Sequence, residues 1–592
     1  MRLHVRRFVL AGGTIIALLI LLFMWIKPFL WDMQHRDNFK PVKIKRLKYQ
    51  RGQSIFLKNA SNNGASSLIG FNERHDSAAD LHSIKSNQSG YSKQFNADDF
   101  GVSTELRNKD NKNKYNLDIW RSDAIPLDRR VPDSRPKECA TLKYPKNLPS
   151  TSVVITMHNE WPSVVLRTVK SIINRTPSSL LKQIIIVDDA SDNDVIKTGL
   201  EKYIAANYKS GLIKLVQQQK RQGLIRSRLV GLDYVRAKVV VFLDSHMEVN
   251  QNWLQPLLTE IVKNRKMLAL AQLDYIDKDT FAYNFYPGYR TRYGFRWDMQ
   301  FFETYFRPDQ TSGKTDTDPL PGVLFVGTGF AVDVKYFKDI GAYDPGMMIW
   351  GGENIELAWR VWMCGGQILH IPCSRIGHIE RNQPYSFPDG RLTTEMYNYK
   401  RAVDIWVGDY KEYVYKQFPG METMDAGSLG EREHLPSQLG CHNFTWFINT
   451  IWPELLRYKE DGDPWGMIKT NTGNMCLDND NYVFQGPYEL LIQPCIYDLQ
   501  RQGFSLTKSG QLRTTIHCVI AKSQDADLIP FIENCFLNPP HKWKYTKNHL
   551  VHIPSGMCLQ AMGSSEQQVP VLQPCKKDLS AQKWIFESRG ML

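Results

Sequence analysis

A run of apolar residues that ends abruptly in polar ones constrains the fold more than any other feature of this chain. Residues 239–243 read VVVFL, and Asp244, Ser245 and His246 follow directly. A continuous apolar run is typical of a strand buried on both faces, and open α/β sheets bind ligands beyond the carboxyl ends of their strands. Asp244 and His246 lie two apart, so on an extended segment they face the same way and could share one divalent cation. An ordinary strand end with an exposed acid remains the alternative.

The preceding segments predict neighbours for this strand. Residues 152–156 and 184–189 are strand-like, and a helical pattern runs between them from Val164 to Asn174. This order predicts parallel strands joined by a right-handed crossover. This second strand ends in Asp188 and Asp189, and the strand at 239–243 ends in Asp244. The acid at one strand end could bind a base or ribose and the acid at the other a metal. Either acid could also simply cap the next turn.

The chain lacks the glycine loops that usually bind phosphates. Neither GxGxxG nor GxxxxGK[ST] occurs, which argues against the Rossmann and P-loop classes. A diphosphate would then need a cation, and an imidazole beside a carboxylate favours Mn²⁺. His378 follows the apolar residues 368–371 and is expected beyond a strand end, where it could be a third ligand or only a packed residue.

The amino terminus predicts a membrane anchor. Residues 8–26 carry no charge, and this segment is long enough for a transmembrane helix. Arg2, Arg6 and Arg7 precede it, which predicts that residues 1–7 lie in the cytosol. A cleavable signal peptide is the alternative. The polar residues 27–116 are expected to form a flexible lumenal stem. The asparagines that begin sequons include Asn59, Asn87 and Asn443, which agrees with a lumenal location.

The net charge and the cysteine pattern narrow the expected partners and the cellular compartment. The 592 residues predict several domains, and the net charge of +13 is not gathered beside stacking aromatics. Nucleic acid is therefore not expected as a partner, whereas an anionic sugar nucleotide or a membrane surface fits. The ten cysteines form no CxxC pair, so disulfides in an oxidising compartment are favoured over zinc. Six of them recur as three pairs about 40 residues apart.

These three pairs mark a repeated unit. CLD at 476–478 and QPC at 493–495 are echoed by CLQ at 558–560, QPC at 573–575 and QKW at 582–584. The pattern resembles the ricin-type β-trefoil lectin, which predicts an all-β domain over residues 465–592. Its sugar site would need an acid and a stacking ring, for which Asp478 and Tyr497 are the candidates. Because Arg501 stands where that family usually has Asn, a purely structural trefoil remains the alternative.

Six motifs in one order carry a second resemblance. They are TMHNE at 156–160, VDD at 187–189, GLIRSR at 223–228, LDSH at 243–246, WGGEN at 350–354 and CSRIGH at 373–378. With the trefoil, they resemble the polypeptide N-acetylgalactosaminyltransferase family. The resemblance implies an α/β GT-A domain over residues 117–440, a linker over 441–464, and transfer of GalNAc from UDP-GalNAc to Ser or Thr of proteins or glycopeptides. It further implies retention at the anomeric carbon, Mn²⁺ as cofactor, a Golgi membrane location and initiation of mucin-type O-glycans.

The resemblance also assigns roles. It places Mn²⁺ on Asp244, His246 and His378. It implies that substrate-binding residues are Thr156, Asp189, Arg226, Ser245 and Gly327. Trp350, Glu353 and Asn354 would lie at GalNAc and the attacking hydroxyl, and Arg381 and Tyr385 would belong to a loop over the diphosphate. It suggests the disulfides Cys139–Cys373 and Cys364–Cys441.

Two departures from the family pattern leave rivals open. Residues 326–330 read VGTGF where the family usually has AGGLF, which puts the β-branched Thr328 near the sugar. The stretch 378–385 is one residue shorter than usual, with Glu380 where an aromatic is common. A membrane-anchored glycan- or peptide-binding protein with a decayed site, or a transferase that uses another donor sugar, are therefore the competing hypotheses.

Overall fold

The computed structural model describes residues 95–100, 104, 114–286, 290–382, 386–471, 473–482, 486–524, 527–536, 541–564 and 567–592. The predicted cytosolic tail (1–7), membrane anchor (8–26) and nearly all of the stem (27–116) lie outside the described residues, as does Tyr385. Among the residues that are described, no helix combines the length and apolar character needed to cross a membrane. The anchor therefore stays a prediction.

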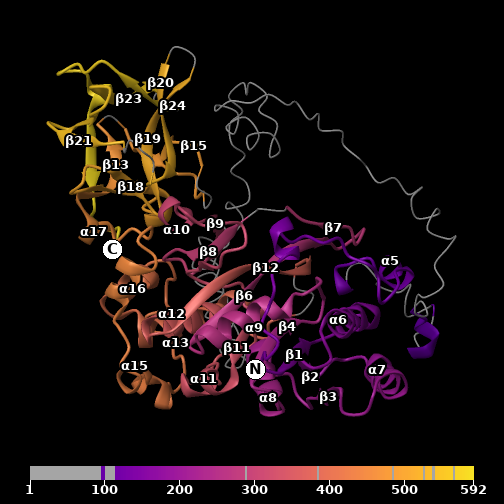
Figure 1. The fold of residues 1–592 in the computed structure, drawn as a ribbon. Helices are drawn as coiled ribbons and strands as arrows, with labels where there is room; N and C mark the ends of the chain where they lie inside the picture. Colours follow the sequence, from indigo (N-terminus) through magenta and orange to yellow (C-terminus); the bar gives the residue numbers. More distant parts are fainter. Residues whose placement is uncertain are drawn as a thin grey trace, which may run out of the picture. The chain divides into compact units, whose positions relative to one another are not determined.

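A mixed sheet organises the first half of the described chain (Figure 1), with the strand order β10-β12-β6-β11-β4-β1-β2-β3; β5 pairs with β12, and β7 with β6. The strands are β1 (Thr151–Met157), β2 (Leu181–Asp188), β3 (Ile213–Gln217), β4 (Val239–Asp244), β5 (Met247–Val249), β6 (Met267–Asp277), β7 (Tyr283–Asn284), β10 (Leu320–Pro321), β11 (Phe330–Asp333) and β12 (Gln367–Glu380). A separate hairpin pairs β8 (Thr291–Phe295) with β9 (Phe301–Tyr305).

The parallel part of the sheet confirms the strand–helix–strand prediction. β1 pairs in parallel with both β2 and β4, and α6 (Pro162–Arg175) connects β1 to β2. Val239, Val241 and Leu243 pack into one buried cluster, whereas Val240 and Phe242 pack into another on the opposite face. The run is apolar throughout because helices cover both faces of this strand.

Helices from different parts of the chain supply those two covers. α6 and α9 contribute to the cluster with Val241, and α8 and α12 to the cluster with Phe242. The helices of eight or more residues are α6, α7 (Asp194–Asn207), α8 (Leu224–Asp233), α9 (Leu254–Lys263), α12 (Glu353–Met363) and α13 (Arg391–Trp406). The shorter ones are α5 (Ile119–Ala124), α10 (Pro308–Thr311), α11 (Val334–Asp339), α14 (Lys411–Tyr415), α15 (Leu435–Gln438), α16 (Phe444–Thr450), α17 (Tyr458–Asp461) and α18 (Leu499–Gln502).

The other side of the sheet corrects one expectation. β12 runs parallel to β6, but its register shifts between Ile371 and Arg375 and the strand then continues to Glu380. The expectation that His378 lies beyond a strand end is therefore wrong, since the apolar residues 368–371 are only the first part of a longer, irregular strand. His378 instead pairs with Met247 of β5.

The carboxyl-terminal residues form the expected all-β unit, a 13-stranded antiparallel arrangement. Each repeat contributes two residues to the shared core. The residue after the first cysteine is Leu477, Val519 or Leu559, and the later aromatic residue is Phe504, Trp543 or Trp584. Its strands are β13 (Gly462–Thr470), β14 (Met475–Asp478), β15 (Tyr488–Glu489), β16 (Leu491–Pro494), β17 (Gly503–Thr507), β18 (Leu512–Thr514), β19 (His517–Gln524), β20 (Asp527–Asn534), β21 (Trp543–Thr546), β22 (His549–His552), β23 (Met557–Gly563), β24 (Gln568–Gln573) and β25 (Trp584–Glu587).

All ten cysteines are paired. The disulfides are Cys139–Cys373, Cys364–Cys441, Cys476–Cys495, Cys518–Cys535 and Cys558–Cys575, which confirms both pairings that the resemblance suggested. Cys364 caps the carboxyl end of α12, so its bridge to Cys441 ties the helix that begins at Glu353 to the segment before α16.

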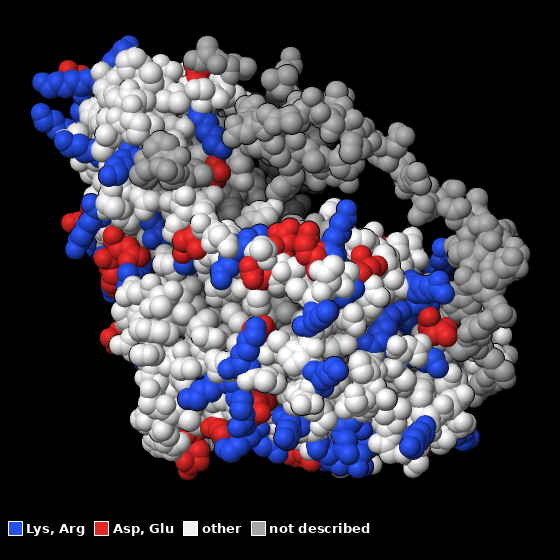
Figure 2. Space-filling model, viewed as in Figure 1, with Lys and Arg blue, Asp and Glu red and all other residues white. Residues whose placement is uncertain are grey.

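The surface carries both signs of charge. On the face shown in Figure 2, Lys and Arg are spread over the molecule with Asp and Glu among them, and they form no single stripe. On this face the positive charges are thus dispersed, as the sequence suggested.

His370 in β12 predicts a pH dependence of stability. It is buried, both ring nitrogens lack a hydrogen-bond partner among the described residues, and burial, helped by nearby Arg292, lowers its pKa to about 3. Because the unfolded chain binds the proton more readily, stability falls as the pH drops below about 6.5. Between pH 7 and 5 we expect His370→Leu to lose about 2 kcal/mol less unfolding free energy than the wild type.

Denaturant unfolding at the two pH values measures this difference, and replacement of the exposed His434 by Leu is the control. Equal pH dependence in wild type and His370→Leu would show that His370 does not titrate in this way.

Candidate active site

A cavity opens at the carboxyl ends of β1, β2 and β4, where the sequence predicted a site. In the register of the sheet, Thr156 of β1 lies opposite Asp244, and Met157, the last residue of β1, lies opposite Asp188. The cavity is lined by Thr156, Met157, His158, Glu160, Asp189, Arg221, Leu224, Ser227, Asp244, Ser245, His246, Phe301, Val326, Thr328, Ile349, Trp350, His378 and Arg381.

The three predicted metal ligands meet in this cavity. One ligand atom each from Asp244, His246 and His378 lie within 4.8 Å of one another, and the His378 Nε2 atom is 3.7 Å from the Asp244 Oδ2 atom. Burial and the neighbouring His246 ring lower the pKa of His378 to about 4, so its imidazole is neutral at pH 7, as a ligand must be. A carboxylate with two imidazoles fits a divalent transition metal.

Glu160 organises this cluster, although the sequence analysis gave it no role. Its Oε2 atom is 2.9 Å from His246 Nδ1 and accepts from Ser245 Oγ at 3.0 Å and from an Arg381 guanidinium nitrogen at 2.5 Å. Burial alone would raise the pKa of Glu160, but Arg381 and His246 lower it to about 2. The carboxylate thus holds His246 by Nδ1 and leaves Nε2 for a metal. The position of Glu160 in the TMHNE motif is the sequence signal that could have indicated this role.

A buried arginine joins the metal cluster to Glu353. Arg228 is 1% exposed; it lies 3.2 Å from Asp244 Oδ1 and 3.9 Å from Glu353 Oε1. Arg228 therefore does not lie on a solvated face of α8. Burial raises the pKa of Glu353, and the Arg228 charge partly opposes this. Glu353 also accepts a bond from the Gly351 backbone N–H at 2.9 Å.

The predicted nucleotide residues are only partly brought together. Thr156 Oγ1 is buried in the cavity wall without a partner among the described residues, which leaves it free for a ligand. Asp189 accepts bonds from the backbone N–H groups of Gln222 and Gly223. Arg226 is not among the lining residues; its guanidinium donates to the backbone oxygens of Pro345 and Gly346. Arg221, which the sequence analysis overlooked, lines the cavity instead.

The departure at residues 326–330 has a clear structural role. Gly327 and Gly329 adopt positive φ, and between them Thr328 points its hydroxyl at β4, where Oγ1 accepts from the Asp244 backbone N–H at 3.0 Å. Thr328 therefore extends the β11–β4 pairing by one bond through its side chain. Asn354 donates to the Phe325 oxygen at 2.8 Å and so supports the same loop from α12.

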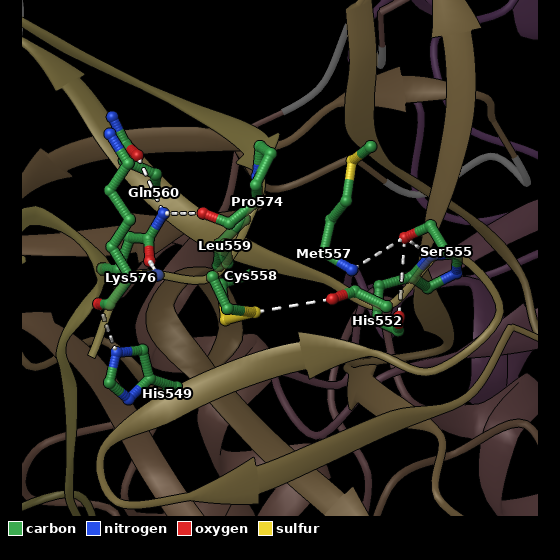
Figure 3. Close-up of a disulfide and its surroundings, with 12 residues drawn as sticks. His549, His552, Ser555, Met557, Cys558, Leu559, Gln560, Pro574 and Lys576 are labelled. Carbon is green, nitrogen blue, oxygen red and sulfur yellow. Dashed lines mark hydrogen bonds between the residues drawn. A yellow bond between two sulfur atoms is a disulfide. The ribbon is translucent and has the colours of Figure 1, made fainter.

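The candidate sugar site of the first trefoil repeat is occupied by the chain itself. Asp478 is fully buried, and its carboxylate accepts bonds from Arg501 at 3.1 Å and from Gln502 at 3.0 Å. In the third repeat, Gln560, Pro574 and Lys576 surround the corresponding glutamine, Gln582, without an arginine (Figure 3). Tyr497 is 44% exposed, but Asp478, the acid expected to act with it, is already paired.

Comparisons with known proteins agree with this geometry. Residues 152–341 match the family described as glycosyl transferase family 2, residues 318–383 the N-terminal domain of galactosyltransferase, and residues 464–584 the ricin-type β-trefoil lectin domain.

Full-length relatives cover most of the chain. Polypeptide N-acetylgalactosaminyltransferase 10 of Homo sapiens is 35% identical over 490 residues, which is 80% of this chain and 79% of the relative. N-acetylgalactosaminyltransferase 7 of Drosophila melanogaster is 36% identical over 493 residues, covering 80% and 81%. A crystal structure of GalNAc-T7 with UDP, GalNAc and Mn²⁺ superposes with a TM-score of 0.56 at 30% identity, covering 85% of this chain and 93% of that one.

The Glu160 contacts predict a defect in metal binding. In Glu160→Gln the anchor of His246 weakens, so we expect Mn²⁺ affinity to fall by about 10- to 100-fold, measured by titration calorimetry on the full chain. Glu356, a buried glutamate paired with Arg360, offers the matched control Glu356→Gln. Unchanged affinity in Glu160→Gln would contradict the anchoring role.

The Arg501–Asp478 pair predicts a closed sugar site. Arg501→Asn removes the guanidinium and frees Asp478 to accept sugar hydroxyls, so we expect GalNAc to bind at least ~10-fold more tightly than to the wild type, the scale of one charge-assisted hydrogen bond. NMR titration with free GalNAc measures this, with the exposed Lys508 replaced by Asn as control. Equally tight binding by the wild type would show that the pair leaves the site open.

Proposed function

Because this chain belongs to the polypeptide N-acetylgalactosaminyltransferase family, and is therefore a glycosyltransferase, we propose that it transfers GalNAc from UDP-GalNAc to Ser or Thr hydroxyls of proteins or glycopeptides. The observation that supports this most is the meeting of Asp244, His246 and His378 in one cavity with Thr156, Trp350 and Arg381. Retention at the anomeric carbon is part of the proposal and stays a prediction from the family.

The donor side of the cavity suits a nucleotide diphosphate. Asp244, His246 and His378 would hold Mn²⁺, which when bound neutralises charge on a diphosphate leaving group. Arg381 lines the same cavity with only 3% of its side chain exposed, and it adds a cation where negative charge develops. In this proposal Thr156 and Asp189 bind the nucleoside with their oxygens.

The acceptor side is formed by the loop before α12. Trp350 lines the cavity and offers a flat face for a sugar or peptide. Glu353 is buried and lies close to Arg228. In this proposal Glu353 orients the sugar or the attacking hydroxyl by hydrogen bonds, as the family resemblance implies, and Gly351 and Gly352 let the backbone approach closely.

The location belongs to the proposal as well. We propose a single-pass Golgi membrane protein anchored by residues 8–26, with everything after them lumenal. Five disulfides support an oxidising compartment. Asn443 is exposed at the start of α16, where its sequon is accessible to glycan addition.

A transfer assay tests the proposal. The full chain is incubated with UDP-GalNAc, Mn²⁺ and two Thr-rich peptides, one bare and one carrying GalNAc. We expect transfer to at least one peptide, and Asp244→Asn should lower kcat/KM by at least ~100-fold and weaken Mn²⁺-dependent UDP binding, because one of three ligands is lost. The exposed Asp339 of α11 offers the control Asp339→Asn.

The outcomes separate the rivals. UDP binding without transfer to either peptide would favour a binding protein with a decayed site. Transfer from another UDP-sugar alone would indicate a different donor. Unchanged UDP affinity in Asp244→Asn would refute its role as a ligand.

A further inference from the structure

The loop that carries Trp350 follows an unfavourable backbone path. Ile349, Gly351 and Gly352 all have positive φ, at 47°, 102° and 84°, and a β-branched residue such as Ile349 rarely adopts this region. Such a path persists only where the surroundings enforce it. The contacts that enforce it therefore decide where Trp350 lies in the cavity wall.

One buried side chain supplies most of those contacts. Asn398 in α13 is 0% exposed; its Oδ1 atom accepts from the Met348 N–H at 2.8 Å. Its Nδ2 atom donates to the backbone oxygens of Met348 at 2.8 Å, Trp350 at 3.2 Å and Gly351 at 2.9 Å. A neutral amide is well suited to this place, because it offers donors and an acceptor on one small planar group.

Other contacts fix the loop on its remaining sides. The Leu224 N–H donates to the Ile349 oxygen at 2.8 Å. The preceding residue, Gly223, donates its N–H to the Asp189 carboxylate. The Gly351 N–H donates to Glu353. The Arg391 guanidinium, on the same helix as Asn398, lies 5.0 Å from the centre of the Trp350 ring. Asn398 is the side chain that binds both before and after Trp350.

We propose that Asn398 is a positioning residue for the transfer reaction. Through residues 348–351 it holds Trp350 in the cavity wall and the Gly351 N–H on Glu353, while it touches no substrate itself. This inference rests on the proposed function. It does not involve Thr156, Asp189 or the three metal ligands, so it separates the acceptor wall from the nucleotide side of the cavity.

Asn398→Asp tests this with almost no change in shape. The carboxylate keeps the acceptor but loses both donors, and it faces three carbonyl oxygens that repel it. We expect kcat to fall by at least ~10-fold, because a misplacement of about 1 Å in an active site can cost ~100-fold. Mn²⁺-dependent UDP affinity, measured by calorimetry, should stay within twofold of the wild type.

A matched control separates positioning from general destabilisation. Asn479 in the trefoil is also buried and donates to the Gln500 oxygen and to Thr514 Oγ1, so Asn479→Asp should lower the melting temperature comparably without changing kcat. Should Asn398→Asp fold poorly, Asn398→Ser keeps one hydroxyl donor and is measured in the same way.

A double-mutant cycle gives the decisive readout. If Asn398 acts through Trp350, the losses of Asn398→Asp and Trp350→Ala are not additive, and the double variant is no slower than Trp350→Ala alone. Fully additive losses, or an Asn398→Asp enzyme with wild-type kcat, would overturn the inference. Absence of transfer by the wild type would instead refute the proposed function.

Discussion

The pairing of β5 with β12 is the constraint on which the site depends. The sheet brings Met247 opposite His378, and Met247 follows directly after the turn that carries Asp244 and His246. Residues more than 130 positions apart thus become neighbours through backbone hydrogen bonds rather than through flexible side chains. A metal cluster built in this way is as rigid as the sheet that carries it.

Buried ion pairs connect the metal cluster to the residues around it. Glu160 links His246 to Arg381, and Arg228 links Asp244 to Glu353. Isolated charges at these depths would cost several kcal/mol each, so each carboxylate is matched by an arginine on another element. The result is that the metal cluster, Arg381 and Glu353 share one electrostatic network.

Much of this was predictable from sequence because the signals were local. The apolar run before Asp244, the strand–helix–strand order and the threefold cysteine spacing each reflect packing within a short segment. The predictions that failed concern residues whose positions are set by tertiary contacts. Arg226 and Arg221 are indistinguishable until α8 begins at Leu224 and turns Arg226 toward Pro345. No motif around Asn398 predicts its role. The Arg501–Asp478 pair shows that an acid expected to bind sugar can instead pair with an arginine of the same chain.

The Cys139–Cys373 bridge has a consequence for biosynthesis. Its partners are 234 residues apart, and the enclosed chain includes β1, β4 and the first part of β12. The ribosome therefore delivers all of the central sheet except the last part of β12 before this crosslink can close, and for that time Cys139 is a thiol open to wrong partners. Production in a host whose secretory route contains disulfide isomerases should accordingly yield more correctly bridged enzyme than a reducing cytosol.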